Sequence, residues 1–276
     1  MSADIQRLIL SMLLAIGSTV ATAQIARTSN QNPRVQVYEF EDGRMQTEVL
    51  STSALKTTDM AADQGVAISK ALRLPAVNKW SHRELLLVSA GYATNLSDRP
   101  DGLLVSNGNA ASLPSRAELP AAPDDPCPLR HKARLKLSGL FCVKADGKTQ
   151  VSRYSDEAAA DCFQARQSGP LLVEDGHAAV CPRLANERPT HRTVVCVNGN
   201  RVKFIVTESP VDLFELSQWL AGDPAAPRCT WALNLSDSNS SGSLYTERKA
   251  YKPNKPVHFT GTGTNPVAAF IAVRQR

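Results

Sequence analysis

The sequence has few aromatic residues and no dense run of charge of one sign. Phe, Trp and Tyr make up 5% of the 276 residues, so the core must be built mostly from Leu, Val, Ala and Ile. The formal charge of +5 is mild and no more than two Lys or Arg residues are adjacent, whereas nucleic-acid binding needs a concentrated basic face. We therefore expect no nucleic-acid partner. A hydrophobic content of 42% predicts a folded globular chain.

The sequence also lacks the common catalytic and metal-binding signatures. It contains no G-x-S-x-G elbow, H-E-x-x-H pair, P-loop, G-x-G-x-x-G stretch or C-x-x-C spacing. Asp237-Ser-Asn239 is similar to the start of a calcium loop but lacks the glycine and distal glutamate of that loop. We expect no cofactor and no metal. The histidines show no ligand spacing and are interpreted as surface or loop residues: His82, His131, His177, His191 and His258.

Residues 1–23 are typical of a cleaved secretory signal. The apolar stretch Leu8–Ile16 is followed by small residues that end in Ala21-Thr22-Ala23. The alternative is an uncleaved anchor, but the run is too short to cross about 30 Å of hydrocarbon. No later segment resembles a membrane span. We therefore predict a secreted or periplasmic protein with no membrane span after signal cleavage.

The cysteines agree with export. An even count in an exported chain favours disulfides over free thiols or metal ligands. The pairing cannot be deduced from the sequence, and the prediction made here is Cys162 with Cys181 and Cys196 with Cys229, because each pair would tie a loop to a nearby predicted strand. All of the cysteines are disulfide candidates: Cys127, Cys142, Cys162, Cys181, Cys196 and Cys229.

The remaining chain predicts an α+β (mixed α/β) fold, with a mostly antiparallel or mixed sheet, a few flanking helices and disulfide stabilisation. Residues 24–34 are predicted as a flexible arm and 35–276 as a single domain. The loop 113–128, rich in proline, is the only plausible subdomain boundary. Alternating or continuous apolar runs and turn signals predict hairpins over 34–49, 135–153 and 192–206, strands at 84–90, 103–105, 170–173, 230–235 and 268–273, and helices at 57–72, 155–162 and 211–220.

Polar residues follow or precede several of these strands. Gln167-Ser168-Gly169-Pro170 precedes one strand, Arg192-Thr193 opens a hairpin, and Asn234 lies near the end of another strand beside the polar loop 236–241. Asn95 comes just after the strand at 84–90. Polar residues at the ends of several strands are what a pocket at a sheet edge requires.

This ordered set resembles the phosphodiester glycosidase family, which includes exported bacterial proteins, some linked to exopolysaccharide. The resemblance runs from about Glu84 to Tyr245. Two positions depart from the family pattern. The family has Asn-Gly-Gly-aromatic where Asn95 is followed here by Leu96-Ser97-Asp98, and it has Asp-Gly-Gly where Ser236 takes the acidic position and Asp237 comes one residue later.

The resemblance implies cleavage of a sugar-1-phosphodiester on the sugar side. Arg192 would hold the phosphate, because a guanidinium is planar, permanently charged and bidentate. Asp237, or Asp98, would replace the missing acid. The implied substrate-binding residues are Asn95, Gln167, Ser168, Gly169, Thr193, Asn234, Ser240 and Ser241. The alternatives are a salt bridge or strand-end surface position for Arg192, and turn chemistry for Gln167 and Asn95.

Three interpretations of the function follow. The first is an exported phosphodiester glycosidase with a reshaped site. The second is a catalytically inactive family member that binds a sugar phosphate or an envelope polysaccharide. The third is the same disulfide-stabilised fold without a ligand.

Overall fold

The chain forms antiparallel β-sheets with short helices at their margins, which confirms the predicted fold class. The computed structural model describes residues 26–31, 33–55, 66–74, 77, 80, 84–91, 100–117, 137–180, 188–237, 241–246 and 258–275. All strand pairs found within these ranges are antiparallel. Within the same ranges, no helix has the length and apolar character needed to cross a membrane. The predicted signal at residues 1–23 lies outside the described residues.

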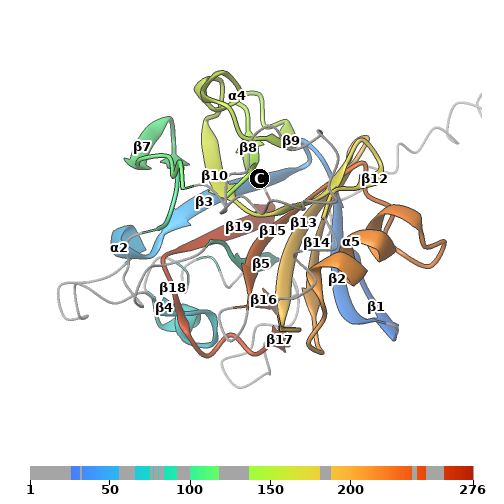
Figure 1. Cartoon of the computed structure of the whole chain (residues 1–276). Coiled ribbons are helices and arrows are strands. Elements are labelled where there is room, and N and C mark those ends of the chain that lie inside the picture. The colour runs from blue at the N-terminus through green and yellow to red at the C-terminus, as the bar shows by residue number, and fades with distance from the viewer. Residues whose placement is uncertain are drawn as a thin grey trace, which may run out of the picture.

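The largest sheet, sheet A, has seven strands in the order β1-β2-β14-β13-β15-β11-β12 (Figure 1). The predicted hairpin at 192–206 is confirmed as β13 and β14, with Asn198 opposite Arg201 and Gly199 at a φ of +57° in the turn. The strands are β1 (Ala26–Gln31), β2 (Arg34–Glu41), β11 (Leu171–Glu174), β12 (His177–Ala178), β13 (Arg192–Asn198), β14 (Arg201–Thr207) and β15 (Trp231–Asp237).

Two five-stranded sheets and one short ladder complete the strand framework. Sheet B has the order β17-β16-β5-β19-β3, and sheet C has the order β7-β6-β10-β8-β9. Sheet B contains β3 (Met45–Ser51), β5 (Leu85–Ser89), β16 (Gly242–Thr246), β17 (His258–Gly261) and β19 (Ala269–Gln275). Sheet C contains β6 (Leu104–Ser106), β7 (Asn109–Ser112), β8 (Gly139–Val143), β9 (Thr149–Arg153) and β10 (Gln164–Ser168). The short ladder pairs β4 (Val66–Ala67) with β18 (Pro266–Val267).

The N-terminal third departs most from the predictions. Residues 34–49 form two strands as expected, but they are not a hairpin, because β2 pairs with β14 in sheet A and β3 pairs with β19 in sheet B. Part of the predicted flexible arm is β1, which pairs with β2 along its whole length. Of the helix predicted over 57–72, residues 66–67 form β4 and only the 3-10 helix η1 (Ile68–Arg73) follows, while residues 56–65 lie outside the described residues.

Each of the short α-helices lies beside a sheet. Helix α2 (Thr52–Leu55) continues directly from β3. The predicted helix near 155–162 is α4 (Asp156–Ala160), which begins after Ser155, whose side chain accepts a hydrogen bond from the Ala158 amide. The predicted helix near 211–220 is α5 (Leu213–Gly222), capped in the same way by Asp212. Figure 1 shows α5 against one side of sheet A, and it contacts β11 and β12.

The two sides of sheet A are buried differently. The α5 side is an apolar layer in which Leu213, Leu216 and Leu220 pack on Val194 and Ile205. The opposite side faces sheets B and C, and the three sheets together enclose the central core. That core takes residues from all three sheets, among them Tyr38, Val195 and Phe204 from sheet A, Leu86 and Val88 from sheet B, and Leu104 and Phe141 from sheet C.

Two disulfides lie within the described residues. The predicted bond between Cys196 and Cys229 is confirmed, whereas Cys162 pairs with Cys142 rather than with the predicted Cys181. The ladder between β8 and β10 pairs Cys142 with Ala165, and Cys162 lies just before β10, where its Cα is 5.4 Å from that of Cys142. Cys127 and Cys181 lie outside the described residues.

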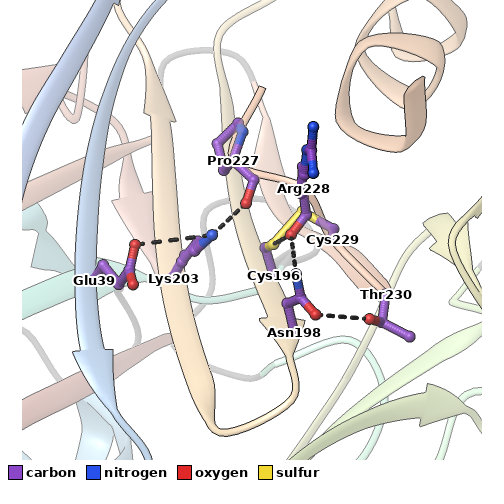
Figure 2. The surroundings of a disulfide bond; sticks show 8 residues. All are labelled: Glu39, Cys196, Asn198, Lys203, Pro227, Arg228, Cys229 and Thr230. Carbon is purple, nitrogen blue, oxygen red and sulfur yellow. Dashed lines mark hydrogen bonds and ion pairs between the residues drawn. A yellow bond between two sulfur atoms is a disulfide. The ribbon is translucent and has the colours of Figure 1, made fainter. Parts of the chain in front are cut away.

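The Cys196–Cys229 bond holds the segment between α5 and β15 against β13, the middle strand of sheet A. Figure 2 shows its surroundings, where the Asn198 amide donates to the Arg228 carbonyl at 3.1 Å and Thr230 donates to Asn198 at 3.1 Å. Lys203 donates to the Pro227 carbonyl. The bond is therefore supported by hydrogen bonds on both sides of Cys229, away from the predicted site residues.

Candidate functional site

The ends of strands from all three sheets meet at one place, which we call the strand-end edge. Strands β5, β10, β14 and β15 end there, and strands β11, β13 and β16 begin there. Antiparallel ladders or hydrogen bonds between the strand ends link all of these strands. The Gly91 amide, just after β5, donates to the Leu235 carbonyl in β15 at 2.6 Å. The edge is where the sequence analysis placed a candidate site, since most of the predicted residues are in these strand ends.

Four buried hydroxyl side chains, Ser89, Thr193, Ser236 and Ser241, form a hydroxyl cluster at this edge. The Ser89 Oγ lies 2.9 Å from the Ser236 Oγ and 3.2 Å from the Thr193 Oγ1. The Ser236 and Ser241 hydroxyl oxygens are 3.4 Å apart. The Gly242 amide donates to Ser89 at 3.0 Å and to Thr193 at 3.1 Å. The predicted residues Thr193 and Ser241 are thus brought together, and Ser236 fills the position that the family resemblance assigns to an acid.

The predicted residues Ser168, Gly169 and Asn234 lie beside this cluster. The Ser168 hydroxyl donates to the Leu235 carbonyl at 3.2 Å, and the Asn234 amide donates to the Gly169 carbonyl at 3.1 Å. Ser168 ends β10, Asn234 lies in β15, and Gly169 precedes β11 through a cis peptide bond to Pro170. The predicted order of motifs therefore corresponds to one region of the fold.

Gln167 lies in a different environment from the residues beside the hydroxyl cluster. It is buried in β10, so the turn interpretation is wrong for this residue. Its Oε1 accepts from the Leu103 and Ser115 amides at 3.1 and 2.8 Å, and its Nε2 donates to the Ser115 and Leu137 carbonyls at 2.8 and 3.0 Å. Two donors and two acceptor positions complete the capacity of a carboxamide. The Gln167 side chain therefore holds the segment around Ser115 in place.

Arg192 opens β13 and is buried, with 1% of its surface exposed, so it is not a strand-end surface residue. The backbone of Arg192 is paired directly with that of Asp237, and the next rung pairs Thr193 with Ser236. Thr193 points to the central side of sheet A, where it contacts Ser89. Because side chains alternate along a strand, Arg192 falls on the α5 side. The strand-end edge therefore carries the hydroxyl cluster on one side of sheet A and the guanidinium on the other.

Two residues of this region were missed by the sequence analysis. Arg166 in β10 is fully buried and donates to the carbonyls of Ala90, Gly102 and Leu103 at 3.4, 3.2 and 3.2 Å. It lies directly over Gly91, where a Cβ atom would be 2.0 Å from the Arg166 Nη2. Gly91 also has a φ of +102°, which side chains disfavour. A glycine immediately after a buried strand is the signal that could have indicated this close approach.

Tyr154 and Asp156, which lie near the segment that Gln167 holds, have shifted pKa values. The Arg116 guanidinium donates to Asp156 at 2.6 Å and, with the Tyr154 hydroxyl, keeps the pKa of that carboxyl below its ordinary value. Burial, followed by its hydrogen bond to Asp156, raises the pKa of Tyr154 to about 12. These groups hold residues 113–117 against the start of α4, so they support the site region and are not part of it.

The rest of the predicted set is placed as follows. Asn95 and Ser240 lie outside the described residues, as do Asp98 and Asn239. For Asp237 only the backbone position opposite Arg192 is described. Within the described ranges, no group of three or more His, Cys, Asp or Glu side chains is arranged to hold a metal ion.

Comparison with known proteins adds a family match and two similar folds. The family model for phosphodiester glycosidases matches residues 84–274, more than two thirds of the chain. No curated protein matches in sequence. A hypothetical protein from Synechocystis superposes with a TM-score of 0.55 and 12% identity over 92% of this chain, which spans only 62% of the Synechocystis protein. The catalytic domain of zebrafish N-acetylglucosamine-1-phosphodiester alpha-N-acetylglucosaminidase, auto-inhibited by its pro-peptide, gives a TM-score of 0.52 and 12% identity over 94% of this chain and 85% of that domain.

Proposed function

Since the chain belongs to the phosphodiester glycosidase family, we propose that it is an exported hydrolase that converts a sugar-1-phosphodiester to free sugar and a phosphomonoester. The observation that carries the proposal is the backbone rung between Arg192 and Asp237 at the strand-end edge. It sets a permanently cationic residue opposite an acidic one, next to the rung that enters the hydroxyl cluster.

The proposed reaction breaks the bond between the sugar C1 and the ester oxygen. Water adds its oxygen to C1 and releases one proton, and the phosphomonoester leaves with the electron pair of the broken bond. A phosphate is a stable anion, so its departure needs less protonation than the departure of an ordinary sugar alcohol. The protein must instead hold negative charge, support a positively charged sugar carbon and orient the water.

The chain offers one residue type for each of these demands. Arg192 would hold the phosphate, because its guanidinium can donate two parallel hydrogen bonds to it. Asp237 would orient the water and support the sugar carbon. Ser168, Asn234 and Ser241 are at the same edge, where each side chain donates to a backbone carbonyl, so they would shape the strand ends around the sugar. A ligand lying across the ends of the strands would reach both sides of sheet A, as open sheets bind ligands beyond their strand ends.

A second candidate function is binding of a sugar phosphate or envelope polysaccharide without turnover. The observation that favours it is Ser236, which takes the acidic position of the family pattern and is hydrogen-bonded inside a cluster of neutral hydroxyls. Loss of a catalytic carboxylate costs orders of magnitude in rate while binding persists.

Hydrolysis of 4-nitrophenyl esters of glucose 1-phosphate and N-acetylglucosamine 1-phosphate separates the two candidates. The hydrolase proposal expects free sugar from the wild-type chain and a loss of about 10²- to 10³-fold in kcat/KM for Arg192→Ala. Arg201→Ala is the matched control, since Arg201 is at the opposite end of the same hairpin and is half exposed. In ¹⁸O-labelled water the phosphomonoester must remain unlabelled, because label in the phosphate would mean attack at phosphorus.

Thermal stabilisation by glucose 1-phosphate, without release of sugar from either ester, would favour the binding candidate. Absence of both stabilisation and turnover over a panel of sugar phosphates would overturn both candidates. An equal loss of activity in Arg192→Ala and Arg201→Ala would contradict the assignment of Arg192.

Export is part of the same proposal. Disulfides persist in oxidising compartments, and two are present among the described residues. We expect the mature protein to begin at Gln24 when the full-length gene is expressed in a bacterium, which mass spectrometry of the periplasmic fraction and medium would check. Retention of residues 1–23 in the recovered protein would contradict cleavage.

A further inference from the structure

Ser89 is the residue around which the hydroxyl cluster is organised. Its Oγ contacts hydroxyl groups of Thr193 and Ser236 and both backbone groups of Gly242, accepting from the amide at 3.0 Å and lying 3.2 Å from the carbonyl. These partners belong to β13, β15 and β16, and Ser89 itself ends β5. One side chain therefore joins two strands of sheet A to two strands of sheet B.

Two hydroxyls of the cluster donate to backbone carbonyls, which can only accept. The Ser241 hydroxyl donates to the His191 carbonyl at 3.0 Å, and the Ser89 hydroxyl donates to the Gly242 carbonyl at 3.2 Å. In the contacts of Ser89 with Thr193 and Ser236, either oxygen can be the donor. The cluster is thus anchored to the backbone at two points, one at His191 and one at Gly242.

The cluster lies where the ladder of sheet A is irregular. The register between β13 and β15 shifts between Thr193 and Val194, because Thr193 pairs with Ser236 and Val194 pairs with Asn234. A bulge of this kind locally disrupts the ladder, so backbone pairing alone fixes the strand ends less firmly. The bonds of Ser89 to both members of the Thr193–Ser236 rung supply a restraint at this point.

We infer that Ser89 is a positioning residue that fixes the Arg192–Asp237 rung by holding the adjacent Thr193–Ser236 rung against sheet B. The expected effect of Ser89 on turnover rests on the proposed function, whereas its expected effect on the strand ends does not. Ser89 would not touch the ligand, because its hydroxyl is completely buried and donates to the Gly242 carbonyl. Its effect on the reaction would come from alignment, and a misplacement of about 1 Å can cost about 10²-fold in rate.

Ser217 provides a matched control. It is also completely buried, its hydroxyl donates to the Leu172 carbonyl at 2.6 Å and accepts from the Val180 amide at 3.2 Å, and it lies in α5 on the apolar side of sheet A. Ser89→Ala and Ser217→Ala therefore each remove a buried hydroxyl that bonds to backbone. We expect comparable losses of melting temperature from the two variants.

The deciding measurement is amide hydrogen exchange under native conditions. We expect the amides of Thr193, Ser236 and Gly242 to exchange at least about tenfold faster in Ser89→Ala than in Ser217→Ala. Ser89→Cys keeps a weak donor and acceptor at the same branch point and should give intermediate rates. Equal exchange at these amides in the two alanine variants would overturn the inference. This readout needs no ligand, so it decides the role of Ser89 even if the chain neither binds nor hydrolyses the sugar phosphates.

If the wild-type chain hydrolyses the nitrophenyl esters, kinetics give a second readout. Ser89→Ala should lower kcat by at least about tenfold with KM changed by less than about threefold, whereas Ser217→Ala should leave both unchanged. Faster exchange in Ser89→Ala together with wild-type kinetics would contradict the alignment role. Failure of the wild-type chain itself to turn over would count against the proposed function and not against the restraint.

Discussion

The two sides of sheet A bury different kinds of side chain. On the α5 side, apolar side chains pack on one another, and the buried Ser217 is satisfied by two backbone groups. On the side that faces sheets B and C, the Arg166 guanidinium, the Gln167 carboxamide and the hydroxyl cluster are buried near the strand-end edge. Arg192 is buried at the same edge on the α5 side. Burying such groups is costly unless each is hydrogen-bonded. The apolar layer under α5 therefore stabilises the sheet, whereas the polar strand-end edge is the part that the proposed function uses.

A pair of glycine substitutions should give the largest contrast between the two sides. Gly91→Ala would drive a Cβ into the Arg166 guanidinium and strain a φ of +102°. Displacing that buried cation should lower the free energy of unfolding by about 3–5 kcal/mol. Gly222→Ala is the control, because Gly222 ends α5 with nothing within 4 Å of the added Cβ. Urea unfolding of both variants measures the difference, and a loss below about 1 kcal/mol for Gly91→Ala would contradict the close approach.

Removing the Cys196–Cys229 bond tests whether the α5 side of sheet A contributes to stability without contributing to binding. The bond joins residues 33 positions apart, and the loss of chain entropy in the unfolded state predicts a stabilisation of about 3–4 kcal/mol. We expect the double variant Cys196→Ser with Cys229→Ser to lose about this much unfolding free energy while keeping its affinity for a sugar phosphate. Calorimetry and ligand-induced melting shifts check the two parts. Loss of ligand binding at matched stability would place this bond in the site.

Restoring an acid at the polar edge should change activity more than stability. Ser236→Asp would place a carboxylate beside the Ser89 hydroxyl, and acid–base assistance is worth up to about 10²- to 10⁴-fold. We expect kcat/KM for the nitrophenyl esters to rise at least about tenfold. The isosteric control Ser236→Asn should not raise it. An unchanged rate in both variants, with glucose 1-phosphate still bound, would favour the non-hydrolysing interpretation.

The smallest expected effect concerns pH and the segment at residues 113–117. The pKa of folded Asp156 lies below its ordinary value of 3.8, so its pairing with Arg116 stabilises the fold above that pH and is lost as the pH falls through the folded pKa. Asp156→Asn should therefore lower the melting temperature slightly at pH 7 and not at pH 2. Glu157→Gln is the neighbouring control. An equal shift at both pH values would contradict the ionic origin of the effect.

The elements that follow from local sequence were predicted, and the elements that depend on distant partners were not. The hairpin predicted over 192–206 is β13 and β14, which are adjacent in sequence and are joined by a turn with Gly199 at a φ of +57°. Strand β10 was missed because its Gln164, Arg166 and Gln167 are typical surface residues. In the structure each of these side chains bonds to backbone groups between 30 and 115 residues away.

The site was predicted in outline for the same reason. The order of motifs led to Ser168, Thr193, Asn234 and Ser241, which do meet at one edge of the fold. Ser89 was not predicted, because a serine at the end of an apolar strand has no local signature. The wrong pairing of Cys162 has the same origin, since its true neighbour Cys142 is set by the unpredicted ladder between β8 and β10.

The position of β19 has a consequence for the biogenesis of the protein. This strand lies between β3 and β5, whose paired residues precede it by roughly 180 to 230 positions, and all of its residues pair with one or both of them. Sheet B therefore cannot close until residue 275 has left the ribosome. Pairing over such separations is slow, because the entropy of closing a long loop is lost before the contacts between the strands stabilise it. Sheet B thus stays incomplete for most of the synthesis of the chain, and an incompletely folded polypeptide is the form that can be threaded across a membrane.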